Sequence, residues 1–525
     1  MLPHPTARAA LGAVALLASL TAVAAPLTPA DIDRLAGRAL QEFSVPGAAV
    51  GIVKDGKLVF ARGYGVRELG RPAAVDADTS FAIGSISKSF TTAALAILVD
   101  EGKVGWDDRV IDRLPEFRLW DPYVTREFTV RDLLTHRSGL GLGAGDLMFV
   151  PATDFTRRDL MHALRYFKPV SSFRSQFAYD NSMYVVAGEV VQAVSGQTWE
   201  EFVTARLLRP LGMSGCAAAA ERQADHSNIA EPHAVVAGHL QRVPRLEIPM
   251  VGPAGGVQCN LSGMARWVAV QLGHGRSPDG TVLFSAAQGE EMWSPQTPLR
   301  PRGRQAELTR THFQAYGLGW NLEDFNGLKR VSHNGGLPGM VTHVSLLPEL
   351  DVGVIVLTNQ QEGSALAALA LPILEAYAGA ARHDWVAELA AIRSARQRMI
   401  QDADAARAPT PAPAAPAPET LAAYVGTYSD PWRGPATISR QGDGLRLTFS
   451  HTDGLAGPLV AQSPDLLIAR WDDRSLNADA YVHFARDYSG KVTGFTMRAV
   501  SAATDFSFDF QDLEFTRVVE RAAGH

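Results

Sequence analysis

Hydrophobic and polar residues follow a helical period near the start of the chain and then alternate. Residues 27–43 carry apolar side chains at helical spacing, and Thr28 and Pro29 supply a helix start signal. Residues 48–53 and 57–61 are apolar-rich and flank Asp55-Gly56, which predicts a β-hairpin. A loop and an apolar helix follow at 81–99. This order predicts helices packed against a mainly antiparallel sheet.

The middle of the chain predicts a largely helical region over residues 155–275 and closely spaced strands after it. A short helix is expected at 130–134, and the paired glycines within 253–257 predict a tight turn. Further helices are expected at 181–195, 198–208, 261–272, 364–377 and 384–406, and strands at 316–320, 331–337, 341–347 and 352–357.

Composition changes sharply after the last of these helices. Residues 408–418 alternate proline with alanine and threonine, which predicts an extended spacer without a core. Short stretches beyond it alternate apolar with polar residues, which predicts an all-β barrel or sandwich. We therefore expect four segments: a signal peptide (1–24), a main domain (25–380), a helix with a linker (381–419) and a β-domain (420–525).

The first residues have the features of an export signal. His4 and Arg8 precede the apolar run 9–20, and Ala22-Val23-Ala24 is a pattern that signal peptidase accepts. The run is short for a membrane span and no later stretch is apolar enough for one, so we expect a periplasmic or secreted protein without an integral span after signal removal. An uncleaved anchor is the alternative.

Charge and cysteine content narrow the possible partners. The 525 residues carry a formal net charge of -6, without a basic cluster for nucleic acid. No Cys/His spacing resembles a metal site, so no metal or other cofactor is expected. Export would permit a disulfide between Cys216 and Cys259, although two cysteines in a domain this large are expected to be buried small residues. The sequence leaves the oligomeric state open.

The chemistry centres on Ser85 and Lys88, at the start of the apolar helix. Residues three apart lie on one face of a helix, so the hydroxyl and the amine can meet. A serine beside an amine that accepts its proton is the Ser-x-x-Lys arrangement of a nucleophile. The alternative is that Ser85 only caps the helix.

Two further groups supply what such a serine needs. Tyr179 and Asn181 stand at the start of another apolar helix, where a phenol can transfer a proton and an amide can orient the lysine and a substrate carbonyl. His333-Asn-Gly335-Gly336 lies on a predicted strand, and the Gly336 N–H is a candidate partner for that of Ser85 in an oxyanion hole. Each group alone has a structural alternative, a core aromatic or a β-turn.

The three groups together resemble the serine β-lactamase and penicillin-binding superfamily. The resemblance covers about residues 30–380 and is strongest to the branch of class C β-lactamases, D-Ala-D-Ala carboxypeptidases, D-aminopeptidases and related esterases. Supporting matches are Phe81-Ala-Ile-Gly84, Leu133-Leu-Thr-His-Arg-Ser-Gly139 and Ala254-Gly-Gly-Val257. The resemblance implies an α+β main domain with an antiparallel sheet flanked by helices and an all-helical subdomain, followed by a β-domain that is lipocalin-like in some relatives.

The resemblance also implies the roles of the site residues. Ser85 forms an acyl-enzyme, Lys88 and Tyr179 share the proton transfers, and Asn181, His333, Gly335 and Gly336 bind the substrate. Class C β-lactamases usually carry lysine at the position of His333, and a neutral imidazole is a weaker carboxylate anchor. We therefore expect a peptidase acting on small-molecule or peptide amides. An esterase, a β-lactamase, or a sensor that is acylated without turnover are the alternatives.

Overall fold

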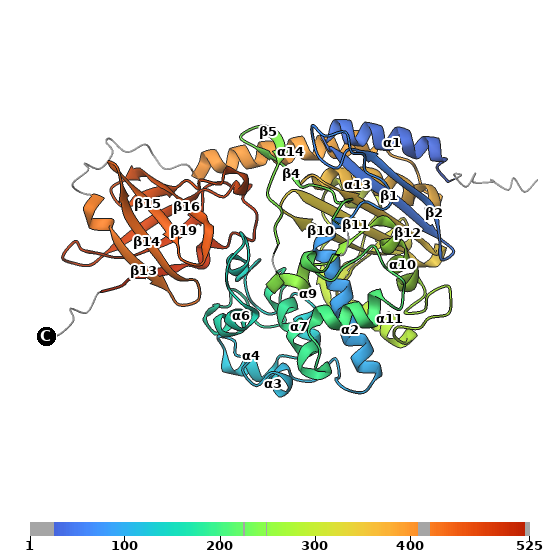
Figure 1. The fold of residues 1–525 in the computed structure, drawn as a ribbon, viewed down its shortest axis with the longest axis horizontal. Coiled ribbons are helices and arrows are strands. Elements are labelled where there is room, and N and C mark those ends of the chain that lie inside the picture. Colours follow the sequence, from blue (N-terminus) through green and yellow to red (C-terminus); the bar gives the residue numbers. More distant parts are fainter. Residues whose placement is uncertain (1–25, 224–225, 248, 408–420, 520–525) are drawn as a thin grey trace, which may run out of the picture.

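The computed structural model describes residues 26–223, 226–247, 249–407 and 421–519 (Figure 1). The predicted signal peptide (1–24) and the whole of the predicted proline-rich spacer (408–418) lie outside these residues. The main domain contains an eight-stranded sheet in the order β2-β1-β12-β11-β10-β9-β8-β7, and every pairing within it is antiparallel. Its strands are β1 (Gly47–Lys54), β2 (Lys57–Gly65), β7 (Thr297–Leu299), β8 (Gln314–Tyr316), β9 (Asn321–Phe325), β10 (Leu328–Leu337), β11 (Met340–Leu347) and β12 (Val352–Thr358).

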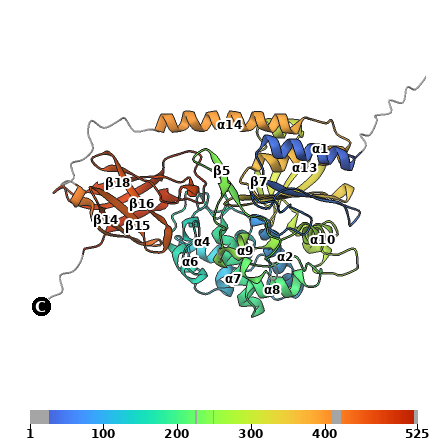
Figure 2. The ribbon, with the colours of Figure 1, turned by 45° about the horizontal axis from the view of Figure 1, so that its top comes forward.

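Helices cover both faces of this sheet. On one face, α1, α13 and the start of α14 bury an apolar layer that includes Phe43, Val354 and Trp385 (Figures 1 and 2). On the other face lies a helical region that contains α2, α7 and α10. The helices are α1 (Pro29–Glu42), α2 (Ser87–Asp100), α3 (Val110–Arg113), α4 (Pro122–Glu127), α5 (Val130–Leu133), α6 (Arg157–Ala163), α7 (Asn181–Ser195), α8 (Trp199–Val203), α9 (Gly252–Gly255), α10 (Leu261–Leu272), α11 (Ala286–Met292), α12 (Gly303–Leu308), α13 (Gly363–Ala378) and α14 (Trp385–Arg407).

The structure differs from the sequence prediction in several local elements. Residues 317–320 form a turn after β8 instead of continuing the strand, and residues 252–255 form the short helix α9 where a tight turn was expected. The predicted helical region also contains a hairpin of β4 (His233–Val236) and β5 (His239–Arg242). Both hairpin strands are short, so they show little of the alternation that marks a strand in sequence.

The C-terminal part is a closed antiparallel barrel, which decides between the predicted barrel and sandwich. Its eight strands pair in sequence order, and the first strand pairs with the last. The strands are β13 (Gly426–Asp430), β14 (Gly434–Gln441), β15 (Gly444–Phe449), β16 (Thr452–Ser463), β17 (Leu466–Ala469), β18 (Ala480–Arg486), β19 (Val492–Ala499) and β20 (Glu514–Arg517). Aromatic rings fill its interior, including Tyr428, Phe495 and Phe515. Helix α14 extends from the main domain toward the barrel (Figure 2).

Cys216 and Cys259 form a disulfide, the pairing that export permits and that the sequence left open, instead of remaining two buried thiols as composition favoured. Cys259 belongs to β6 (Gln258–Cys259), which pairs with β3 (Phe81–Ala82) just before the Ser85 segment. The sequence could not show whether the two thiols meet, because 43 residues separate them. Among the described residues, no helix combines the length and apolar character needed to cross a membrane.

Candidate active site

Ser85 lies in a single turn of 3-10 helix, Gly84–Ile86, which leads directly into α2. Gly84 has a φ of 53°, and a Cβ atom built on it would lie 2.7 Å from the backbone nitrogen of Gly336. Only glycine adopts this left-handed conformation easily and allows so close an approach. The backbone before Ser85 therefore packs directly against the end of β10.

Buried hydrogen bonds and packing hold the start of α2 in place. The Ser87 hydroxyl donates to the Gly84 carbonyl at 2.7 Å and accepts from the Val257 N–H at 3.0 Å. One turn later, the Phe90 ring stacks on Trp267 of α10 with centroids 3.9 Å apart. The helix that carries Lys88 is thus fixed to both neighbouring segments.

Lys88 is fully buried and contacts three oxygen atoms. Its Nζ lies 3.1 Å from Ser85 Oγ, 2.7 Å from Asn181 Oδ1 and 3.0 Å from the carbonyl oxygen of Ala254 in α9. Amide oxygens can only accept hydrogen bonds, whereas a hydroxyl can also donate. A neutral Lys88 would therefore donate to Asn181 and Ala254 and direct its lone pair at the Ser85 hydroxyl.

The surroundings favour this neutral form. Burial lowers the pKa of Lys88 from its usual value near 10.5 to about 7, and the Asp146 and Asp180 carboxyl groups oppose part of this change. Desolvation disfavours an ammonium ion because the low-dielectric interior cannot replace its hydration. Lys88 can thus accept a proton near neutral pH.

Tyr179 and Asn181 lie beside Lys88, at the start of α7. The Lys88 Nζ atom lies 4.7 Å from the centre of the Tyr179 ring. Burial raises the pKa of Tyr179 well above 10, and the Ser85 hydroxyl opposes this shift. Tyr179 is therefore a neutral phenol over the physiological pH range and can donate a proton.

The end of β10 forms the third side of the site. Strand β9 pairs with β10 only as far as Ser332, so the edge of β10 beyond that residue is free of β9. A Cβ atom on Gly335 would overlap the Ile83 carbonyl oxygen, whereas a Cβ on Gly336 would meet no atom within 4 Å. Gly335 thus permits close packing against the Ser85 segment, and Gly336 faces open space.

His333 is buried, with 3% of its surface exposed. Its Nδ1 lies 2.6 Å from the Asn334 carbonyl oxygen, so Nδ1 carries the proton and Nε2 accepts from the Tyr316 hydroxyl at 2.9 Å. Burial and the nearby Lys88 lower the pKa of His333 to about 3. A neutral imidazole at this position gives no positive charge to a substrate carboxylate.

Several residues of the site were not singled out from the sequence. His136, which has a φ of 53°, packs its ring at a tilt against Tyr179 and Tyr316, with centroids 4.2 Å and 4.6 Å away, and its Nδ1 accepts from the Asp180 N–H at 3.0 Å. Asp146 accepts from Asn181 Nδ2 at 2.8 Å. The family-like motif at residues 133–139 includes His136, whereas no sequence signal marked Asp146.

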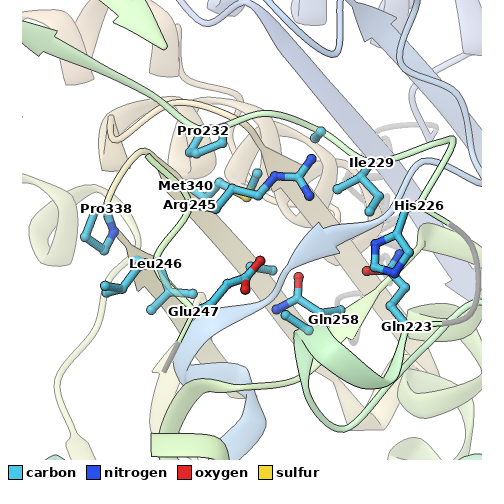
Figure 3. A pocket seen from close by; sticks show the side chains of 14 residues that line it. Gln223, His226, Ile229, Pro232, Arg245, Leu246, Glu247, Gln258, Pro338 and Met340 are labelled. Atoms are coloured by element: carbon cyan, nitrogen blue, oxygen red, sulfur yellow. The ribbon is translucent and has the colours of Figure 1, made fainter. Parts of the chain in front are cut away.

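A pocket lies beside the site, between β3, β6 and the end of β10 (Figure 3). Ala82 and Gln258 line the pocket from the β3–β6 pair, and Leu337, the residue after Gly336, lines it from the end of β10. Arg245 and Glu247 contribute charged groups, and Arg245 pairs with Glu231. The part of the chain that the structure describes contains no group of three or more His, Cys, Asp or Glu side chains suited to a metal ion.

Comparisons with known proteins agree with this architecture. The Beta-lactamase family model matches residues 32–378, and a second model, Domain of unknown function (DUF3471), matches residues 410–517. The octameric penicillin-binding protein homologue from Pyrococcus abyssi shares the fold, with a TM-score of 0.60 and 21% identity over 94% of this chain and 100% of that chain.

Two relatives are more similar in sequence. Unguisins hydrolase ungD' of Aspergillus campestris is 30% identical, in an alignment that covers 65% of this chain and 63% of that protein. Penicillin-binding protein 4 of Amycolatopsis lactamdurans is 31% identical over 61% of this chain and 82% of that protein. This chain thus spans less than two thirds of the unguisins hydrolase. The Beta-lactamase family model matches more than half of the chain, so the protein belongs to the beta-lactamase and penicillin-binding protein superfamily.

Proposed function

We propose that the protein is an exported peptidase of the D-Ala-D-Ala carboxypeptidase or D-aminopeptidase type, which cleaves amide bonds through an acyl-enzyme on Ser85. The observation that carries the proposal is the position of Lys88 Nζ, which lies between the Ser85 hydroxyl and two oxygens that can only accept hydrogen bonds. The geometry directs the lysine lone pair at the nucleophile.

Acylation follows from this arrangement. Ser85 Oγ attacks the substrate carbonyl carbon while its proton passes to Lys88 Nζ. We assign to the backbone N–H groups of Ser85 and Gly336 the stabilisation of the negative oxygen that develops. Asn181 keeps the lysine in position through its Oδ1. The opposite pKa shifts of the two groups favour Lys88 as the base, because burial lowers the pKa of Lys88 whereas Tyr179 keeps its own proton.

The leaving amine needs a proton, and Tyr179 is the group suited to deliver it. The phenol is neutral, interacts with Ser85 and lies beside the protonated Lys88, from which it can be recharged. The C–N bond then breaks and leaves an ester on Ser85. Attack by water, with Lys88 and Tyr179 again moving the proton, would release the acid and restore the serine.

The neutral His333 and the relatives support a peptide amide as the substrate. Without a cation at residue 333, a β-lactam carboxylate has a weaker anchor than in an enzyme with lysine there. One relative is named as an unguisins hydrolase, and a structural neighbour, SurE, was solved with D-Leu. The pocket beside β3 offers both apolar and charged groups for a peptide side chain.

The test combines covalent trapping with turnover. The wild type and Ser85→Ala are incubated with a β-lactam and analysed by intact mass, and both are then assayed with paired D- and L-amino-acid amides and peptides. A stable adduct on the wild type alone, with faster hydrolysis of the D-amides, supports the proposal. Turnover of esters but not of amides would favour an esterase. Rapid hydrolysis of the β-lactam would favour a β-lactamase, and an adduct without turnover of any substrate would favour a sensor. An adduct that persists in Ser85→Ala would overturn the assignment of the nucleophile.

Export is part of the same proposal. It is supported by the apolar run at residues 9–20 with its small-residue cleavage pattern, and by the disulfide, which suits an oxidising compartment. Cell fractionation followed by N-terminal sequencing tests it. A periplasmic or secreted form that begins near Ala25 supports export, and an intact cytoplasmic chain would contradict it.

A further inference from the structure

The barrel reaches the active site through the segment that connects β19 to β20. We call residues 500–513 the barrel loop. Within it, Asp509 is fully buried, and its carboxylate accepts from the Gly145 N–H at 2.6 Å and the Leu147 N–H at 3.0 Å. These two amides belong to the glycine-rich segment 139–149 of the main domain, so the loop is docked directly onto it.

The backbones of the two domains are almost in contact here. A Cβ atom on Gly143 would lie 2.6 Å from the Phe506 carbonyl oxygen. The Gly143 N–H donates to the Tyr179 carbonyl at 2.9 Å. The Phe506 ring lies edge-on to the Tyr179 ring, with centroids 6.0 Å apart. The barrel loop therefore borders the segment that carries Tyr179.

A buried chain of hydrogen bonds runs from this loop to the lysine. Ser507 Oγ donates to Asp146 Oδ2 at 2.8 Å, and the same oxygen accepts from Asn181 Nδ2 at 2.8 Å. Asn181 Oδ1 in turn accepts from Lys88 Nζ. Ser507 is 8% exposed and Asp146 is fully buried.

The direction of these bonds determines how Asn181 is oriented. Because Asp146 Oδ2 accepts a hydrogen bond, the amide must turn its Nδ2 toward Asp146 and its Oδ1 toward Lys88. Ser507 is the second donor to that oxygen and keeps the carboxyl group turned toward Asn181. A misplaced Asp146 would allow the amide to flip, and Nδ2 would then face the Lys88 amine.

We propose that Ser507 of the barrel is a positioning residue for the serine hydrolase, which acts on Lys88 through Asp146 and Asn181. The barrel thus completes the active site and is more than an appendage. This inference rests on the proposed roles of Ser85 and Lys88, and its test is designed to separate the two.

The test uses the full-length protein with Ser507→Ala and Ser507→Thr. The matched control is Ser501→Ala, because Ser501 lies in the same loop and its hydroxyl donates to Asp404 of α14 at 2.7 Å, away from the catalytic groups. Acylation by the covalent probe and turnover of the best amide are measured per active site titrated, so molecules that fail to fold are not counted.

We expect Ser507→Ala to lower the acylation rate about tenfold with little change in KM. Ser507→Thr should recover most of that rate, and Ser501→Ala should match the wild type.

The pH profile of acylation is a second readout. Burial and the neighbouring Asp509 raise the pKa of Asp146, and the Ser507 hydroxyl opposes this rise. Loss of the Ser507 donor therefore raises the Asp146 pKa further and weakens the support that this carboxyl group gives to the Lys88 ammonium, so the rising limb of the pH profile moves to lower pH. The titratable groups that interact with or surround the lysine are Asp146, Asp180, Tyr179, Tyr184, His136 and His333.

Three results would count against the proposal, in different ways. An unchanged rate and pH profile in Ser507→Ala, with Ser85→Ala inactive, would reject the role of Ser507 and leave the active site standing. Equal losses of acylation rate in Ser507→Ala and Ser501→Ala would show that Ser507 only helps to dock the barrel. Full activity in Ser85→Ala would instead overturn the proposed active site, and with it this inference.

Discussion

At the scale of single residues, the site separates two groups that could each act as the base. Lys88 and Tyr179 are neighbours, and burial acts on both, but in opposite directions. Desolvation always favours the uncharged form, which is the amine for a lysine and the phenol for a tyrosine. One buried environment therefore prepares a proton acceptor beside a proton donor.

The first prediction concerns the pH dependence of acylation. The pKa of Lys88 is about 7, and only the neutral amine can accept the Ser85 proton, so the rate should rise with pH through about 7 and then level off. Stopped-flow acylation at several pH values measures this. Lys88→Arg should remain charged and lose roughly 10²–10⁴-fold. A rate that is flat between pH 5 and 8 would contradict Lys88 as the base.

At the scale of elements, the neighbouring glycines at the end of β10 have different functions. Gly335 packs against the Ile83 carbonyl, whereas Gly336 faces open space beside Ser85. Both are glycines in the same motif, so the sequence does not distinguish them. Their surroundings predict different responses to an added methyl group.

The second prediction compares Gly335→Ala with Gly336→Ala. Gly335→Ala forces the Ser85 segment away from β10 and should lower the free energy of unfolding by about 1–3 kcal/mol, as overpacking does. Gly336→Ala should keep the wild-type melting temperature but raise KM, because its methyl group projects into the free space. Calorimetry and steady-state kinetics check the pair. Equal melting temperatures for the two variants would be inconsistent with this packing.

The third prediction concerns the disulfide that braces β6. It closes a loop of 43 residues, and loss of such a constraint on the unfolded chain typically destabilises a protein by about 2–4 kcal/mol. Because β6 pairs with β3, the strand before Ser85, Cys216→Ala/Cys259→Ala should lower the melting temperature and weaken acylation. Calorimetry of the variant, with and without reductant, measures the effect. As the control, the reductant should lower the melting temperature of the wild type and leave that of the variant unchanged.

At the scale of the whole molecule, the barrel and the main domain share buried polar contacts and exposed ones. Asp509 is buried against two backbone amides, whereas the Lys168–Glu514 ion pair across the same interface has side chains 56% and 65% exposed. Exposed ion pairs contribute little, because solvent and salt screen them. The buried Asp509 carboxyl group, which accepts hydrogen bonds from two backbone amides, should therefore dominate the docking.

The fourth prediction tests this difference. Asp509→Ala leaves the Gly145 and Leu147 N–H groups without their partner, which costs about 1–3 kcal/mol for each buried donor. Hydrogen exchange in segment 139–149 should accelerate, and activity should fall as Ser507 moves away. Lys168→Ala is the matched control and should change neither. Unaltered exchange in Asp509→Ala would show that the barrel docks through other contacts.

Much of the main domain could be predicted from the sequence because its signals are local. Helix α10 spans Leu261–Leu272 as expected, and the hairpin of β1 and β2 surrounds Asp55-Gly56. Ser85 and Lys88 meet because a three-residue spacing places them on one helical face, whatever surrounds them. Periodicity, turn residues and motif order act over a few residues, so the chain itself determines them.

Tertiary structure alone decided the features that depend on distant neighbours. Closure of the barrel required β13 to meet β20, and the disulfide required two segments to converge. The neutral state of Lys88 and His333 comes from burial by other elements. Ser507 lies 361 residues from Asp146 in sequence, so no local pattern marks their hydrogen bond. Residue order determined which chemical groups are present, whereas packing determined their protonation and their partners, because desolvation and hydrogen bonding depend on proximity in space.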